Sequence, residues 1–363
     1  MLSIEAASAT AIGSFPGTDV REIARIIAGE LPDFPVIPEL PKRGPGADMI
    51  GRTVGILAGT AAEWAAETTP TGWRLSGNTT TALTAATRKA QSFLSEDLDT
   101  AEEIWSSFEG PIKIAMAGPW ALASCLELPN GNLVISDLGA VRDLVQAYDE
   151  SATALMGQLQ RRLPNAQIVV QLDEPTAHSV VTGQIPTQSG LANHSAVDSE
   201  DVRLALSKVI TTLHRADAQV VVHNCDTRPP IDLLLHSKPD GIALDFTVLA
   251  DEPRFDETIG RMIDSGCTLI AGIVDVRPTS YYERRQSIVN ESINILLARM
   301  SRIGFPIEEI VDRLAISPGC GFSADASLEG VKKVLAQLHE CTRILRGIEP
   351  AEDGHENLLT EGL

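Results

Sequence analysis

Eight short runs of apolar, mostly β-branched residues recur along the chain, and longer segments with a helical pattern separate them. The runs lack a strict alternation of polar and apolar residues, which indicates parallel strands that are buried on both faces. Parallel strands that alternate with helices are typical of an α/β fold. The eight runs cover residues 9–15, 34–40, 112–118, 167–173, 219–225, 241–246, 268–275 and 313–320.

The segments between these runs show the apolar spacing of amphipathic helices. The last helix is expected to begin at an Asp325 N-cap, with Glu329 in its first turns. Two stretches, 68–80 and 180–197, hold more chain than a connection needs, and the first of them is predicted to form a hairpin. Helices are predicted over residues 18–28, 82–107, 138–162, 199–216, 281–303 and 326–346.

Eight strand-then-helix units in a chain of this length predict a single closed (β/α)8 TIM barrel over residues 1–346. A doubly wound open sheet is the alternative. That fold would predict a glycine-rich phosphate loop after an early strand, and the sequence contains no GxGxxG or P-loop lysine motif. Residues 347–363 are acidic without an apolar face, so we expect them to form a mobile tail.

The net charge argues against several classes of partner, and the cysteine content argues against a disulfide-bonded protein. A net charge of −20 argues against nucleic acids and anionic membranes. The sequence has no apolar run of about 18 residues and no secretory signal pattern at its start. The five cysteines are odd in number and widely spaced, which does not fit a disulfide framework. We therefore expect a cytoplasmic protein whose cysteines pack, bind metal or react.

Polar or conformationally special residues follow almost every predicted strand. In a (β/α)8 barrel the active site lies at the carboxyl ends of the strands, where these residues would meet at one rim. A barrel with a purely structural role does not need this concentration of reactive side chains. The strand-end residues include Ser14, Glu39, Gly118, Asp173, Cys225, Asp245, Asp275 and Cys320.

His223 and Cys225 stand two residues apart on one strand, so their side chains point to the same face. An imidazole nitrogen beside a thiolate suits zinc. Cys320, in a Pro-Gly-Cys-Gly turn after the last strand, is a third candidate ligand, and Asp245 is a candidate oxygen ligand. The alternative is a buried histidine with unrelated buried cysteines.

The other three cysteines, Cys125, Cys267 and Cys341, are predicted to be packing residues.

A carboxylate pair, Asp173 and Glu174, ends the fourth strand. Adjacent strand residues point to opposite faces, so only one of the two faces the mouth. We predict that Asp173 contacts substrate and that Glu174 lies behind it. A substrate amine would be the natural partner of such a carboxylate, whereas the alternative is an ordinary Asp-Glu-Pro helix start.

These motifs together resemble the catalytic barrel of cobalamin-independent methionine synthase, within the superfamily that also contains uroporphyrinogen decarboxylase. The chain is similar to the short, single-barrel members, and the resemblance covers residues from about 10 to 345. The matching stretches occur in the family's order. They are Ile12-Gly13-Ser14-Phe15-Pro16, Gln171-Leu172-Asp173-Glu174-Pro175, His223-x-Cys225 and Cys320-Gly321.

The resemblance implies zinc-dependent transfer of a methyl group to the thiol of homocysteine, giving methionine. It implies that Asp173 and Glu39 contact the amino acid and that the backbone of Ile12, Gly13 and Ser14 contacts its carboxylate. It implies the metal ligands His223, Cys225, Asp245 and Cys320, where aspartate replaces the family's glutamate and is one methylene shorter.

The methyl donor stays open at this stage, as methyltetrahydrofolate or a methylated corrinoid protein. After the matching Gly272-x-x-Asp275, the resemblance places Arg277 where the folate-using members carry a histidine. Arginine stays charged and does not readily donate a proton to a leaving group. Three further alternatives remain: a decarboxylase of the uroporphyrinogen type, a protein with structural zinc, and methyl transfer to a different thiol.

Overall fold

A computed structural model of the 363-residue chain describes residues 1–77, 82–276 and 285–348. Its centre is an eight-stranded parallel sheet with the strand order β1-β11-β10-β9-β8-β7-β5-β2. Each of these strands falls in, or within one residue of, one of the eight predicted runs. The strands are β1 (Ser8–Ala9), β2 (Val36–Ile37), β5 (Pro111–Ala117), β7 (Gln167–Asp173), β8 (Gln219–Asn224), β9 (Gly241–Asp245), β10 (Thr268–Val274) and β11 (Leu314–Pro318).

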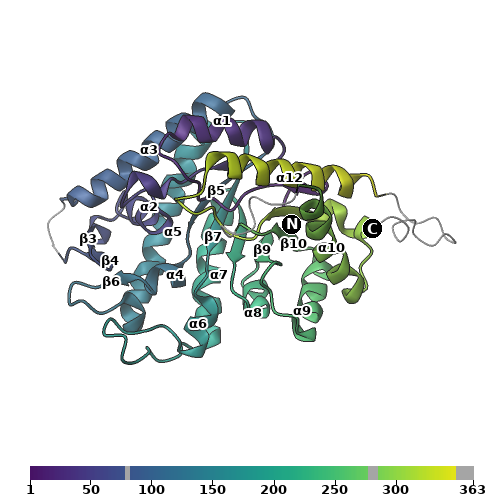
Figure 1. The fold of residues 1–363 in the computed structure, drawn as a ribbon. Helices are drawn as coiled ribbons and strands as arrows, with labels where there is room; N and C mark the ends of the chain where they lie inside the picture. The colour runs from purple at the N-terminus through teal and green to yellow at the C-terminus, as the bar shows by residue number, and fades with distance from the viewer. Residues whose placement is uncertain (78–81, 277–284, 349–363) are drawn as a thin grey trace.

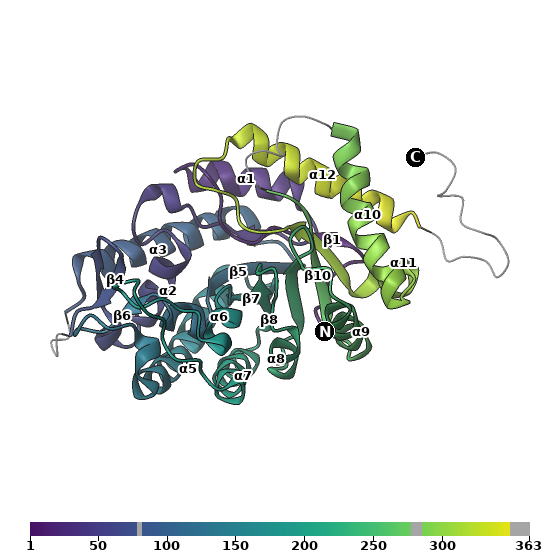
Figure 2. The ribbon, with the colours of Figure 1, turned by 60° about the horizontal axis from the view of Figure 1, so that its bottom comes forward.

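The chain links the two edges of this sheet just beyond β1 and β2. Ser14 and Glu39 form a parallel bridge. The Phe15 N–H donates to the Glu39 carbonyl at 2.9 Å, and the Glu39 N–H donates to the Gly13 carbonyl at 3.0 Å. The strand order thus runs in a circle, and Figure 2 shows the curled sheet ringed by helices. The predicted TIM-barrel architecture is confirmed.

The helices cover the outer face of the sheet (Figures 1 and 2). The first of them buries Val20, Ile23, Ala24 and Ile27, which is the one-sided stripe expected of an amphipathic helix. No helix of the described residues is long and apolar enough to cross a membrane. The α-helices are α1 (Val20–Glu30), α2 (Met49–Leu57), α3 (Ala85–Trp105), α4 (Pro119–Ala123), α5 (Leu138–Arg162), α6 (Ala177–Thr182), α7 (Ser199–Arg215), α8 (Ile231–His236), α9 (Pro253–Asp264), α10 (Arg285–Ile303), α11 (Ile307–Ile310) and α12 (Leu328–Arg346), and the 3-10 turns are η1 (Pro41–Arg43), η2 (Ala62–Trp64), η3 (Val134–Ser136) and η4 (Val311–Arg313).

Several details outside the barrel strands test the predictions. The hairpin is confirmed as β3 (Ala66–Thr69) and β4 (Gly72–Leu75), which β6 (Leu126–Glu127) extends to three strands. The prediction of Asp325 as the N-cap of α12 is wrong. The helix starts two residues later than predicted, and Ser327 is the N-cap, with its hydroxyl accepting from the Gly330 N–H. The predicted acidic tail lies outside the described residues from position 349 onward.

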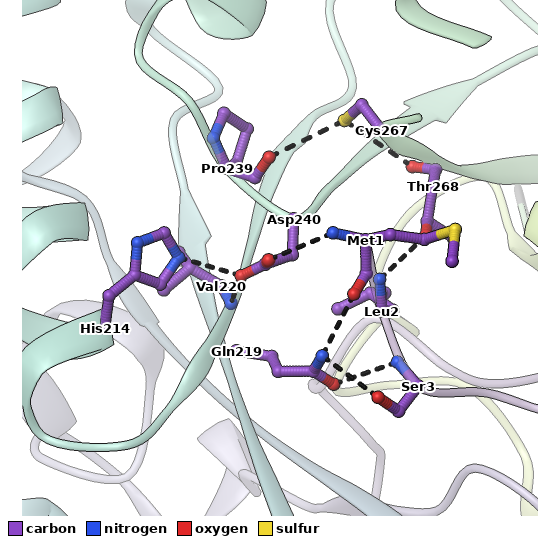
Figure 3. Close-up of polar contacts among 10 residues, drawn as sticks. All are labelled: Met1, Leu2, Ser3, His214, Gln219, Val220, Pro239, Asp240, Cys267 and Thr268. Carbon is purple, nitrogen blue, oxygen red and sulfur yellow. Dashed lines mark hydrogen bonds and ion pairs between the residues drawn. The ribbon is translucent and has the colours of Figure 1, made fainter. Parts of the chain in front are cut away.

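The amino end of the barrel is closed by the start of the chain. Leu2 is buried in a cluster with Phe34 and Ile270, and its N–H donates to Thr268 Oγ1 at 3.0 Å. Figure 3 shows Asp240, just before β9, where its carboxylate accepts hydrogen bonds from the N-terminal ammonium group of Met1, from the His214 ring and from the Val220 N–H. The start of the chain therefore fills the amino end of the barrel.

Candidate active site

The parallel register aligns the strand-end residues at one level. Asp173, the last residue of β7, lies directly opposite Ala117 of β5 on one side and His223 of β8 on the other. Asp245, the last residue of β9, lies opposite Gly272 of β10. Residues from different β/α units therefore meet at the carboxyl rim, where (β/α)8 enzymes place their catalytic groups.

His223, Cys225 and Cys320 form a compact group of potential metal ligands. One ligand atom from each lies within 4.8 Å of the others. The Cys225 and Cys320 sulfurs are 3.6 Å apart although the residues are separated by 95 positions in the chain. Two nearby strand ends and the closure of the barrel bring these three side chains together, as the sequence predicted.

The pKa values of the thiols distinguish Cys225 and Cys320 from the other three cysteines. The hydrogen bond between the two thiols lowers the pKa of Cys320, with a further contribution from the charge of His223. The same bond raises the pKa of Cys225. By contrast, burial raises the pKa of Cys125, Cys267 and Cys341 to about 12 in each case, as expected of packing residues.

His223 uses one ring nitrogen to contact a carboxylate, and its other ring nitrogen has no hydrogen-bond partner among the described residues. Its Nδ1 lies 2.7 Å from Asp173 Oδ1. Its Nε2 is buried and has no hydrogen-bond partner among the described residues. Burial alone would lower the pKa of His223, but the hydrogen bond and charge of Asp173 outweigh it and raise that pKa. An unpaired buried nitrogen is costly unless a ligand completes it.

Asp173 lies at the end of β7, as predicted, and its carboxylate has two side-chain partners that the sequence analysis did not predict. Its Oδ1 accepts from His223 and also from Gln171 Nε2, at 2.8 Å. It therefore orients a candidate ligand, and a substrate amine would have to use its other oxygen. Glu174 points the opposite way, as predicted, and accepts from the N–H groups of Trp120 and Ala121 at 3.0 and 2.8 Å.

Glu39 and Ser14 form a second polar pair on the rim, at the bridge that links β1 to β2. The Ser14 hydroxyl donates to Glu39 Oε1, whereas Glu39 Oε2 is buried without a partner among the described residues. Burial raises the pKa of Glu39 to about 7 against the opposing charge of Arg52. In the same stretch, no described group accepts a hydrogen bond from the backbone N–H of Ile12, Gly13 or Ser14.

Asp245 lies near the thiols, but its carboxylate is outside the group of three ligand atoms. Its Oδ1 accepts from the backbone N–H and the hydroxyl of Thr247, at 2.9 and 2.6 Å. A side chain at Gly319 would collide with this carboxylate, since a Cβ there would lie 2.3 Å from Oδ1. Arg277, the predicted catalytic residue on the donor side, lies outside the described residues.

Two polar residues in the barrel interior were not predicted. Gln171 precedes Asp173 by two positions on β7 and so faces the same way. Lys113 lies in the middle of the apolar run that forms β5 and is fully buried. A charged or amide residue inside an otherwise apolar strand was the available signal for both.

Of the two solved structures described next, the first supports the fold. A B12-independent methionine synthase from Shewanella sp. W3-18-1, solved in complex with selenomethionine, has a TM-score of 0.57 at 13% identity, covering 94% of this chain and 98% of that one. A β-methylaspartase from Clostridium tetanomorphum has a TM-score of 0.45 at 12% identity, covering 95% and 60%. No curated protein matches the sequence.

A family model provides the assignment. The model described as "Cobalamin-independent synthase, Catalytic domain" matches residues 112–343, which include the three candidate ligands and Asp173. Cobalamin independence contradicts a methylated corrinoid protein as the methyl donor, so that alternative is withdrawn. The chain belongs to the family of cobalamin-independent synthase catalytic domains.

Proposed function

We propose that this chain transfers a methyl group from methyltetrahydrofolate to the thiol of homocysteine, giving methionine, and that it requires zinc. The observation that carries the proposal is the group formed by His223, Cys225 and Cys320 at the barrel mouth, with one ligand atom from each within 4.8 Å of the others. Membership in the family supports the reaction type.

The chemistry of the donor set fits zinc. Two thiol sulfurs and one imidazole nitrogen are the ligands that zinc prefers, and a catalytic zinc site has three protein ligands and one open position. His223 Nε2 is buried and unpartnered, which is the condition expected of a nitrogen that a metal completes. Asp245 is the fourth candidate: Thr247 donates both of its hydrogen bonds to Oδ1, which leaves Oδ2 for a metal.

Zinc bound there would supply a positive charge that lowers the pKa of a substrate thiol. The chain's own residues would bind and orient the amino acid. The free N–H groups of Ile12, Gly13 and Ser14 are available for its carboxylate. Glu39 Oε2, buried and unpaired, is available for its ammonium group together with the second oxygen of Asp173.

Burial of these groups serves the reaction in two ways. Glu39, Asp173 and His223 are each at most 5% exposed, so water competes poorly for their hydrogen bonds. Rigid strands hold the thiol site and the amino-acid site, which fixes the sulfur for in-line attack on a methyl carbon.

Metal analysis of the purified protein tests the proposal. We expect stoichiometric zinc in the wild type, loss of zinc in Cys320→Ser, and retention in Cys341→Ser. Cys341 is the matched control because it is buried in α12, away from the rim. A freshly purified, unchelated wild type without zinc would refute zinc dependence.

A methyl-transfer assay tests the substrates separately. We expect methionine from methyltetrahydrofolate and homocysteine, and no product when cysteine replaces homocysteine, because the side chain of cysteine is one methylene shorter and its thiol would fall short of the metal when its ammonium group binds the carboxylates. Product formed equally well with other thiols would show a different acceptor.

The cytoplasmic location stays a prediction from the cysteine content.

A further inference from the structure

A continuous line of polar side chains crosses the barrel interior beneath the proposed metal centre. Lys113 Nζ on β5 donates to Gln171 Oε1 on β7 at 2.6 Å. Gln171 Nε2 donates to Asp173 Oδ1 at 2.8 Å, and that oxygen lies 2.7 Å from His223 Nδ1 on β8. All four residues are at most 5% exposed, so no solvent interrupts the line.

The direction of each hydrogen bond in this line follows from the Ile12 carbonyl, which can only accept. The Gln171 amide atom that lies 2.9 Å from this carbonyl is therefore the nitrogen, and it also donates to Asp173. The amide oxygen then faces Lys113 Nζ and accepts from it. A flipped amide would set its oxygen against the Ile12 carbonyl and remove the acceptor from Lys113.

The same logic extends to the histidine. Asp173 Oδ1 accepts from Gln171, so it also acts as the acceptor toward His223 Nδ1. The proton of a neutral imidazole then resides on Nδ1, and the lone pair remains on Nε2. Nε2 is buried and has no hydrogen-bond partner among the described residues, and His223 is grouped with Cys225 and Cys320 as a potential metal ligand.

Charge gives Lys113 a second connection to Asp173. Its side chain is fully buried, with its ammonium group 5.8 Å from the centroid of the Phe34 ring. Burial lowers the pKa of Lys113 to about 7, while the negative charge of Asp173 opposes that decrease. No described carboxylate forms an ion pair with Lys113 directly, so Asp173, reached through Gln171, is its electrostatic partner.

We propose that Lys113 is a positioning residue for the metal centre: through Gln171 it orients Asp173 so that His223 carries its proton on Nδ1 and presents Nε2. The inference rests on the metal site of the proposed function. It assigns a role to a residue that does not contact the candidate ligands, because a change at Lys113 reaches His223 only through three successive hydrogen bonds, with Gln171 and Asp173 between the two residues.

Lys113→Met removes the donor and keeps a side chain of similar length. The first readout is nitrogen NMR of the metal-free protein, selectively labelled at histidine, at a pH above the range in which histidine titrates. The His223 signal is identified by its absence in His223→Gln. We expect the Nδ1–H form in the wild type and a substantial Nε2–H population in Lys113→Met.

The second readout is zinc affinity, measured by competition with a chelator. We expect a decrease of about 10- to 100-fold in Lys113→Met, the usual effect of losing a partner that orients a ligand. Gln171→Met breaks the same line and is expected to reproduce both effects, which covers the case that Lys113→Met fails to fold. Thr10→Val is the matched control, since Thr10 is buried in the same barrel and its hydroxyl has no partner among the described residues.

The inference is overturned if a folded Lys113→Met or Gln171→Met protein keeps the wild-type tautomer and a zinc affinity within about twofold of the wild type, a change well below the expected decrease. The tautomer is measured without metal. A wild type that binds no zinc would therefore refute the proposed function while the NMR result still decides the role of Lys113.

Discussion

Asp173 Oδ1 lies 2.7 Å from His223 Nδ1, and the two residues face each other in the register of β7 and β8. A carboxylate in this position fixes the ring orientation and tautomer of a histidine whose other nitrogen binds a metal. The carboxylate predicted to contact substrate therefore also orients a candidate metal ligand. The proposed substrate site and the proposed metal site share this residue, so a change at Asp173 is expected to affect both.

Asp173→Asn is expected to lower zinc affinity by about 10- to 100-fold, because an amide binds the Nδ1 proton more weakly and can present a donor instead. It is also expected to raise the KM for homocysteine. Chelator competition and steady-state kinetics measure the two effects. Asp198→Asn is the control, since Asp198 caps α7 at the surface and asparagine caps equally well. An unchanged zinc affinity in Asp173→Asn would contradict the orienting role.

Asp245→Ala is expected to retain more zinc than Cys320→Ser. The Asp245 carboxylate is held by Thr247 and lies outside the group of three ligand atoms, whereas Cys320 belongs to that group. Zinc content after dialysis against a chelator compares the two variants. Equal zinc loss in both would identify Asp245 as a direct ligand of the same rank as the cysteine.

Glu39→Gln is expected to change the pH dependence of stability. Burial raises the pKa of Glu39 from 4.5 to about 7, so between these values the folded protein binds more protons than the unfolded chain. The free energy of unfolding of the wild type therefore decreases as the pH rises through that interval, and the stabilisation from this carboxyl is fully present only below pH 4.5. Glutamine does not titrate, so the variant lacks this pH dependence.

The stability of Glu39→Gln relative to wild type should accordingly increase with pH over that interval, by at most about 1.4 kcal/mol per pH unit. Denaturant unfolding at several pH values measures the difference. A difference that stays constant with pH would show that the Glu39 carboxyl titrates normally.

Asp240→Asn tests the closure of the barrel's amino end (Figure 3). Burial by itself would raise the pKa of Asp240, but hydrogen bonds from His214, the Val220 N–H and the N-terminal ammonium group outweigh it and lower that pKa to about 2. The carboxylate thus stabilises the fold above the unfolded value of 3.8, and this contribution is lost as the pH falls through about 2.

We expect Asp240→Asn to lose about 1–2 kcal/mol of unfolding free energy at neutral pH, with the difference narrowing in acid. Asp232→Asn is the control, because Asp232 pairs with Arg261 at the surface with 55% of its side chain exposed. Equal losses in the two variants at neutral pH would contradict a special role for Asp240.

Local sequence patterns determined the elements of this protein. The apolar runs predicted all eight barrel strands, and helix α5 has the bounds that its amphipathic pattern predicted. The two-residue spacing of His223 and Cys225 places both on one face of a strand, which is a property of the strand alone. Both kinds of pattern depend on neighbours within one element.

Tertiary structure decided which side chains meet. Cys320 reaches Cys225, and Lys113 reaches Gln171, only because the sheet curls and sets the register between strands far apart in sequence. The same register turned Asp173 toward His223. No local pattern encodes these distances, since they depend on how the whole barrel closes and packs, so the chain's sequence indicated the reactive groups and the fold determined their partners.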